Sequence, residues 1–355
     1  MNPTTETTAL PTLFLRLWRH LSPHRRFQLW LLLGLVIFSA FVEMISLGIV
    51  LPFLGILIVP EKVFNHPFVL DMAPSFGITS ADQLVLPLTL AFGGVALIAG
   101  AFRILLLWLN TRVAFASGAD ISIEVYRRTL YQPYRVHVAR NSSEVISSIT
   151  YKVNGVVFEV LLPFLFLISS LILSMAITVA LFLIDPMVAS ATIVIFGFSY
   201  GLISWLTRQR VRLNSQRIAH EQTQVVKALQ EGLGGIRDVL LEGAQSVYSD
   251  VYRKADRPLR WAQGNNNFVV NYPRYALESL GMILITALSY ILSLEVGGLA
   301  GSVPVLGALA IGAQRGLPAL QQSYGAWTTI SGAHASLIDT LKLLDQPLPE
   351  EYLQP

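Results

Sequence analysis

Six long apolar stretches dominate this chain and limit what it can fold into. A membrane-crossing helix needs roughly 20 apolar residues, and each stretch reaches about that length. They run at about 29–59, 84–109, 156–184, 187–206, 268–294 and 303–330. We therefore predict an all-α polytopic membrane protein with six transmembrane helices.

The composition agrees with this prediction. The chain has 355 residues, of which 53% are hydrophobic and 13% are charged, whereas soluble domains carry about 25% charged residues. It contains no cysteine, which excludes disulfides, thiolate metal sites and cysteine nucleophiles within this chain. We predict no metal site and no catalytic residue. The first apolar stretch is too long for a signal peptide, so we expect it to be retained.

Basic residues alternate between the connections and predict the orientation. Cytoplasmic segments of membrane proteins are enriched in Lys and Arg. The connections after the first, third and fifth stretches carry only Lys62. Most of the 25 Lys and Arg residues lie in the N-terminal segment, in residues 110–155 and in residues 207–266. Both termini are therefore expected in the cytoplasm. The basic run Arg208 to Arg217 is expected to face anionic lipid rather than nucleic acid.

The N-terminal segment predicts a helix in the membrane interface. Residues 13–21 mix apolar side chains with Arg16, Arg19 and His20 over too few residues to cross a bilayer. Ser22 and Pro23 end this helix. We divide the chain into a tail and interfacial elbow helix (1–28), a six-helix transmembrane domain (29–344) and a C-terminal linker stub (345–355).

The two long cytoplasmic connections predict helices that continue beyond the membrane. Residues 113–131 and 209–229 have apolar side chains at helical spacing. An extra twenty helical residues would reach roughly 30 Å into the cytoplasm. Each connection has a turn-forming centre, one at Tyr131–Val138 and the other at Glu231–Gly243. These two tips are expected to contact another protein.

Three arginines lie inside the apolar stretches, and Arg315 is the most deeply placed. It comes about a dozen residues into the last stretch, which puts it roughly 18 Å deep. Charges inside a membrane normally face a bundle interior or a wet cavity. Arg315 is therefore predicted to contact an anionic cargo. The alternative is a buried ion pair with Glu43 or Glu278 that fixes helix packing.

The other two arginines have competing interpretations of their own. Arg274 precedes Glu278 by four residues, a spacing at which the two can pair on one helix face. Arg103 lies near the cytoplasmic end of its stretch, where its side chain can reach the headgroups. Glu43 is in mid-stretch and is expected to be neutral or paired. We place all five residues in a predicted substrate cavity.

Several motifs resemble the transmembrane domain of ABC exporters, with the closer resemblance to bacterial lipid-linked oligosaccharide flippases. The second tip reads Glu-Gly-Leu-Gly-Gly-Ile-Arg-Asp-Val from Glu231. The other motifs are Phe-Val-Glu-Met-Ile-Ser-Leu-Gly-Ile-Val-Leu-Pro-Phe from Phe41, Tyr-Pro-Arg-Tyr-Ala-Leu-Glu-Ser-Leu-Gly from Tyr272 and Gln-Arg-Gly-Leu-Pro from Gln314. The resemblance covers nearly the whole chain.

The resemblance implies a bacterial inner-membrane location, outward movement of a lipid-linked cargo, and two six-helix domains forming one pathway. Arg103, Arg274 and Arg315 fall where such flippases place arginines that meet the cargo's pyrophosphate. The two tips would be coupling helices that dock on nucleotide-binding domains. Their predicted contact residues are Tyr131, Pro133, Tyr134, Ile236, Arg237 and Asp238.

The ATPase part of such an exporter is not encoded here. No glycine is followed by lysine, so the phosphate-loop pattern G-x-x-x-x-G-K-[ST] is absent. ATP and Mg²⁺ would be bound by a partner nucleotide-binding domain, beside a second copy of this chain or a similar transmembrane domain. One alternative is a scaffold or regulatory protein without a motor. Another is a secondary transporter coupled through Glu43 and Glu278, which the lack of an inverted repeat disfavours.

Overall fold

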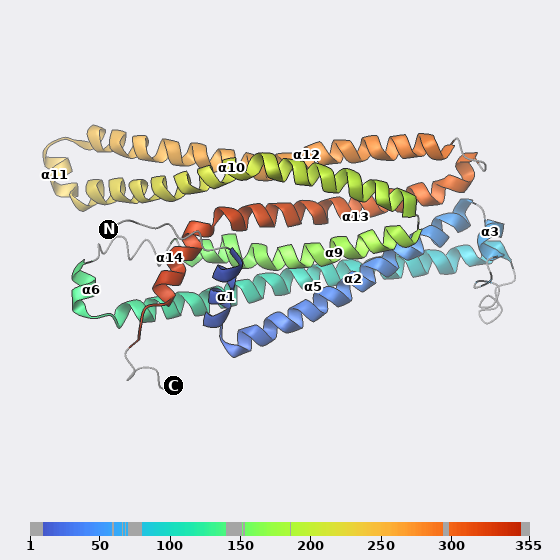
Figure 1. Cartoon of the computed structure of the whole chain (residues 1–355), viewed down its shortest axis with the longest axis horizontal. Coiled ribbons are helices and arrows are strands. Elements are labelled where there is room, and N and C mark those ends of the chain that lie inside the picture. Colours follow the sequence, from blue (N-terminus) through green and yellow to red (C-terminus); the bar gives the residue numbers. More distant parts are fainter. Residues whose placement is uncertain are drawn as a thin grey trace.

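The computed structural model consists of long helices that run roughly along one axis (Figure 1). It describes residues 10–58, 60–65, 67, 69, 80–139, 151, 153–184, 186–293 and 298–348, apart from some side chains inside helices. No strand occurs in these ranges, so the all-α prediction is confirmed for them. The outer ends of the predicted domains, 1–9 and 349–355, lie outside the described residues.

The helical elements follow one another with short breaks. Their bounds are α1 Leu10–His20, α2 Pro23–Ile58, α3 Pro60–Phe64, α5 Ala81–Leu130, α6 Tyr134–Ala139, α8 Val153–Gly155, the π-helical turn η3 Val156–Leu161, α9 Leu162–Ile184, α10 Pro186–Gly234, α11 Ile236–Leu241, α12 Gln245–Ser293, α13 Gly298–Gly332 and α14 His334–Leu344.

Among the described residues, three helical segments are long and apolar enough to cross a membrane. They are α2, α5 and the continuous segment Val153–Ile184. The other three predicted spans fall within α10, α12 and α13, where the side chains of several residues are not described. The structure therefore gives the chain the character of a membrane protein.

Local sequence signals account for where the helices begin and end. Pro23 opens α2, a position where its missing N–H costs nothing. Tyr131 ends α5 shortly before Pro133. Gly243 has a φ of 64°, a left-handed conformation that glycine adopts without steric strain. It turns the chain from α11 into α12.

Helices α2, α5, α9 and α13 form a packed bundle, and α10 and α12 form an antiparallel hairpin beside it (Figure 1). The hairpin joins the bundle mainly through α13, and α11 closes its far end. Close approach of α13 to α9 requires a small residue, because a Cβ added at Gly312 would lie 2.8 Å from Leu181 Cδ2. Glycines at such contacts let transmembrane helices pack closely.

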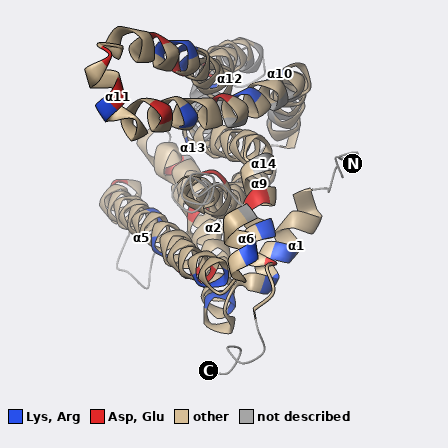
Figure 2. Cartoon of the chain, turned by 90° about the vertical axis from the view of Figure 1, so that its left-hand side faces the viewer, with Lys and Arg blue, Asp and Glu red and all other residues tan. Residues whose placement is uncertain are grey.

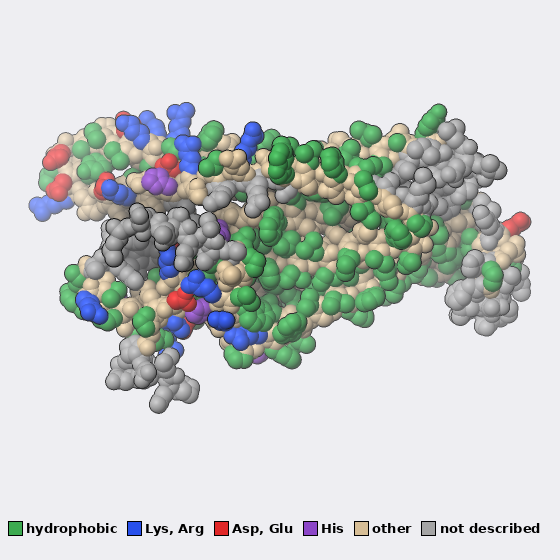
Figure 3. All heavy atoms as spheres, in the orientation of Figure 1, with side chains coloured by type: hydrophobic (Ala, Val, Ile, Leu, Met, Phe, Trp, Pro, Cys, Tyr) green, Lys and Arg blue, Asp and Glu red, His purple; other side chains and the backbone are tan. Residues whose placement is uncertain are grey.

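Charged residues gather at the end of the molecule that carries α6 and α11, which we call the charged end (Figure 2). The middle of the molecule presents mainly hydrophobic side chains (Figure 3). Among the exposed ones are Leu97 on α5 and Leu183 on α9, at 78% and 76% exposure. An apolar surface of this extent is typical of a membrane-facing protein.

A candidate anion-binding cavity

Two of the three predicted arginines meet on one carboxylate, that of Glu43. Arg103 Nη2 donates to Glu43 Oε1 and Oε2 at 2.6 and 2.9 Å, and its Nε lies 3.2 Å from Oε2. Arg315 Nη1 donates to Glu43 Oε1 at 2.7 Å and to Ser46 Oγ at 2.9 Å. The Glu43 side chain is only 3% exposed. This cluster of four residues joins α2, α5 and α13.

The physical reason for the cluster is the cost of a buried charge. A carboxylate away from water costs several kcal/mol unless charged or polar groups replace its hydration. Ser46 follows Glu43 by three residues on α2, so both side chains lie on one helix face. That face meets α5 and α13. The bidentate contact of Arg103 adds geometric specificity.

Glu43, Arg103 and Arg315 of this cluster line a cavity of about 540 Å³. Arg274 on α12 also lines this cavity, and no residue in the described part of the chain pairs with it. Three arginines against one glutamate give the lining a net charge of +2. The structure thus places Glu43, Arg103, Arg274 and Arg315 along one cavity.

Glu278 does not belong to this group. It is not among the residues that line the cavity, and the described structure contains no Arg274–Glu278 ion pair. The alternative in which Arg274 pairs with Glu278 along α12 is therefore not seen among the described residues. Arg103 also differs from one expectation, because its guanidinium binds Glu43 instead of reaching out to headgroups.

Several polar residues of the cavity were not singled out from the sequence. The hydroxyl of Tyr200 is buried and has no hydrogen-bond partner among the described residues. Tyr324 shares a hydrogen bond of 3.0 Å with Thr207. The remaining polar side chains of the lining are those of Asn271, Gln314, Gln321 and Gln322.

A sequence signal for part of this set was present. Gln322 follows Arg315 by seven residues, which is close to two helical turns, so both lie on the same side of α13. Glutamines inside a predicted membrane span are costly in lipid, and they therefore mark a polar cavity. Tyr200 carried no comparable signal, because tyrosines are common in membrane helices and at their ends.

The two predicted tips are the short helices α6 and α11 at the charged end. Tyr134 on α6 is 83% exposed and Tyr131 is 40% exposed, while Pro133 separates α6 from α5. On α11, Ile236 is 46% exposed. The predicted contact residues Arg237 and Asp238 are also exposed.

A second ion-pair cluster lies near these tips and involves the end of the described chain. Asp345 pairs with Arg16, and its Oδ1 lies 2.9 Å from His20 Nε2. Arg128 on α5 donates to the backbone carbonyls of Leu344 and Gln346. We call Arg16, His20, Arg128 and Asp345 the C-terminal clamp.

The clamp lowers the pKa of Asp345 from its ordinary value. Partial burial alone would raise this pKa, but hydrogen bonds and charge from Arg16 and His20 outweigh burial. The clamp covers an apolar core in which Leu13 and Leu17 of α1 and Leu337 and Leu341 of α14 are almost fully buried. The elbow helix therefore holds α14 against α5.

Neither a protein-family model nor a curated protein sequence matches this chain. The resemblance to ABC exporters rests on the motifs of the chain itself. In the described ranges, no group of three or more His, Asp or Glu side chains is arranged to hold a metal ion.

Proposed function

We propose that this chain is the transmembrane subunit of an ATP-driven ABC exporter with six spans and cytoplasmic termini. Its cargo would be a lipid-linked oligosaccharide or another amphipathic anion, moved outward. A partner would supply the nucleotide-binding domain, and a second transmembrane domain would complete the pathway. The observation that carries the proposal is the cavity in which two arginines are neutralised in part by Glu43 while Arg274 has no partner among the described residues.

The chemistry of the lining favours an anion that also carries hydroxyl groups. Arginine guanidinium groups match phosphate oxygens in charge and geometry. Arg103 and Arg315 each use only some of their five N–H donors on Glu43 and Ser46. Arg274 and the Tyr200 hydroxyl supply further donors. The glutamine amides Gln314, Gln321 and Gln322 could bind sugar hydroxyls as donors and acceptors.

The exposed tips support the need for a partner. Leu240 and Leu241 on α11 are 59% and 74% exposed at the charged end, where the predicted orientation leaves them in the cytoplasm. Apolar side chains exposed together outside a membrane mark interaction sites. Docking of a nucleotide-binding domain would cover them and transmit its closure to α10 and α12.

The cargo proposal is tested by ligand binding to the full chain in lipid nanodiscs, with farnesyl diphosphate as the anionic probe. Arg274→Gln should weaken binding about tenfold or more, since a hydrogen bond to a charged group contributes roughly 1.5–3 kcal/mol. Arg274 is exposed and has no partner in the part of the chain that the structure describes, so its loss should leave the fold unchanged.

Arg257→Gln is the matched control, because Arg257 is an exposed arginine on the same helix and does not line the cavity. It should bind the probe like the unaltered protein. Farnesol, which lacks the diphosphate, should bind weakly and equally to all variants. Equal binding of the diphosphate to Arg274→Gln would reject the anion site and favour the scaffold alternative.

The docking proposal has a separate test in charge reversal at the α11 tip. Arg237→Glu and Asp238→Lys should each weaken co-purification with the ATPase partner, since both side chains are exposed at the proposed interface. Arg260→Glu, placed further along α12, serves as the control. Unchanged co-purification of the α11 variants would remove α11 from the interface.

A further inference from the structure

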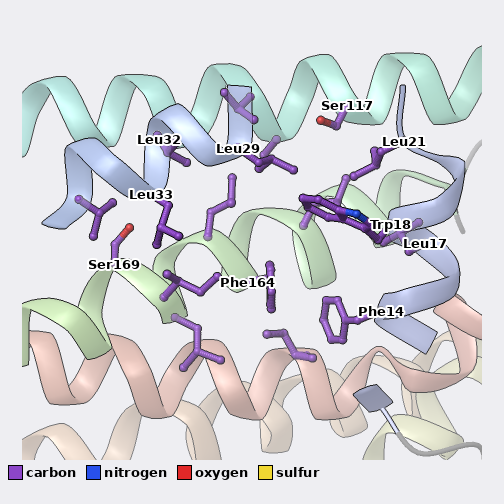
Figure 4. Close-up of a pocket in the computed structure, with 18 of the residues that line it drawn as sticks. Phe14, Leu17, Trp18, Leu21, Leu29, Leu32, Leu33, Ser117, Phe164 and Ser169 are labelled. Carbon is purple, nitrogen blue, oxygen red and sulfur yellow. The ribbon is translucent and has the colours of Figure 1, made fainter. Parts of the chain in front are cut away.

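A second cavity lies beneath the elbow helix and shares no lining residue with the arginine cavity. It has a volume of about 670 Å³ and is bounded by α1, α2, α5, α9 and α13. Figure 4 shows Phe14, Trp18, Leu29, Leu32 and Phe164 around it. We call it the elbow cavity.

Aromatic contacts and hydrogen bonds hold the walls of the elbow cavity in place. Phe14 stacks on Phe164 with ring centroids 4.6 Å apart, and Trp18 meets Trp30 edge to face at 6.5 Å. Arg26 on α2 donates to the backbone carbonyls of Trp18 and Arg19 at 3.1 and 2.9 Å. These contacts fix the angle between α1 and α2.

Water is a poor occupant for this cavity. Apolar cavities much smaller than this one stay dry and take up apolar molecules instead. The lining is almost entirely aliphatic and aromatic, with Ser117 and Ser169 as its only hydroxyl side chains. The hydroxyl of Ser117 is buried and lacks a partner among the described residues. An apolar ligand with a polar atom near Ser117 fits better than water.

The position of the elbow cavity indicates which kind of apolar molecule can reach it. Its mouth includes Leu15 and Trp30, which are 63% and 64% exposed and continue into the apolar surface of the molecule. That surface would face acyl chains in a membrane. The opposite face of α1 carries Arg16, Arg19 and His20, so the cavity lies directly under a basic helix.

Arg19 supplies the charge complementarity. Arg16 is engaged by Asp345, and Arg26 by two carbonyl groups. The guanidinium of Arg19 is exposed and has no side-chain partner in the described part of the chain. A basic group at the membrane surface attracts anionic headgroups. We propose that the elbow cavity binds one acyl chain of an anionic phospholipid, from the leaflet that borders the charged end, with Arg19 contacting the headgroup phosphate.

The test uses the full chain in nanodiscs and a phosphatidylglycerol that carries a photoactivatable group at the end of one acyl chain. Crosslinks should concentrate on residues 14–21, 113–117 and 164–168, above the level on the exposed surface around Leu90. The same probe with a phosphatidylcholine headgroup should label these residues less. Labelling spread evenly over the apolar surface would overturn the proposal.

Two substitutions test the acyl-chain contact and the headgroup contact separately. Ala114→Phe places a ring in the cavity, because Ala114 is 1% exposed and lines it; it should abolish the concentrated labelling. Ala91→Phe makes the same change on the exposed face of α5 and should have no effect. Arg19→Gln should weaken retention of phosphatidylglycerol about fivefold, as expected for one arginine near the surface, whereas Arg135→Gln on α6 should not.

Arg19→Gln also keeps the proposal open to refutation if Ala114→Phe does not fold. Unchanged retention of phosphatidylglycerol in Arg19→Gln, together with even labelling of the unaltered protein, would reject the site. A photoactivatable polyprenyl phosphate provides the last arm. If it labels the cavity and phosphatidylglycerol does not, the occupant is the tail of a cargo, and the phospholipid assignment is wrong.

Discussion

Two carboxylates in this molecule are each held by two basic side chains from elsewhere in the fold, and they differ in their access to water. Glu43 is 3% exposed between Arg103 and Arg315, and Asp345 is 39% exposed between Arg16 and His20. A buried charge depends on its partners for nearly all of its solvation, whereas an exposed one can return to water. Burial, and not the number of partners, should therefore decide how much each cluster contributes to the stability of the protein.

The largest effect is expected for Glu43→Ala. It would leave Arg103 and Arg315 together without their shared anion, and removing one partner of a buried ion pair costs about 3–5 kcal/mol. Thermal unfolding of the purified protein should show a large loss of stability. Glu278→Ala is the control, because Glu278 is exposed and unpaired among the described residues. Equal stability of the two variants would mean that Arg103 and Arg315 do not depend on Glu43.

Arg315→Ala should have an intermediate effect. Arg103 still balances the charge of Glu43, but Ser46 and Glu43 each lose a donor, and one hydrogen bond to a charged group contributes about 1.5–3 kcal/mol. A double-mutant cycle provides the check. In a Glu43→Gln background the same substitution should cost less, since residues in one network do not act additively. Additive losses would contradict a shared network.

Disruption of the C-terminal clamp should change the stability of the protein only slightly. Asp345→Asn removes an exposed ion pair, and such pairs contribute about 0–1 kcal/mol. The global unfolding temperature should hardly change, while hydrogen exchange in α14 should become faster because α1 holds this helix less firmly. Asp250→Asn, which removes an exposed pair with Arg253 on α12, is the control. If Asp345→Asn lowered the stability of the whole protein as much as Glu43→Ala, burial would not explain the difference between the two clusters.

Mild acid should have the smallest effect of all on the contact between α1 and α14. The folded pKa of Asp345 is below its ordinary value of 3.8, so its contribution is fully present above that ordinary value. It is lost only as the pH falls through the folded pKa. The chain has no cysteine, so spin labels on cysteines introduced into α1 and α14 can report their distance.

That distance should stay constant from neutral pH down to the ordinary range of a carboxyl group, and should increase only below it. The labelled Asp345→Asn variant should show no such transition. A transition already near neutral pH would assign the change to another group.

Elements set by local signals could be predicted from the sequence. Proline and glycine fix backbone angles within one or two residues, so the break at Ser22–Pro23 and the turn at Gly243 follow from the chain itself. The length of the apolar stretches similarly indicated membrane-crossing helices in α2, α5 and the segment Val153–Ile184. The prediction of an exposed tip at Ile236 also rests on neighbouring residues alone.

Contacts between distant residues could not be predicted in the same way. Glu43 and Glu278 were both possible partners of Arg315 in the sequence, and only the packing of α2 against α13 selects Glu43. The i,i+4 spacing of Arg274 and Glu278 permits a pair but does not require one. The contacts of Asp345 with α1 span more than 300 residues of sequence, and no local pattern marks them.

The uninterrupted course of α5 has a mechanical consequence. One helix of 50 residues carries Arg103 in its middle and ends beside the α6 tip. From Arg103 to the end of α5 the distance is roughly 40 Å at 1.5 Å per residue. A tilt of about 5° at the Glu43 contact would therefore move the far end by roughly 3.5 Å, from that same length. α5 would then pivot at its contact with Glu43, so that a small displacement at the cavity becomes a larger shift at the α6 tip.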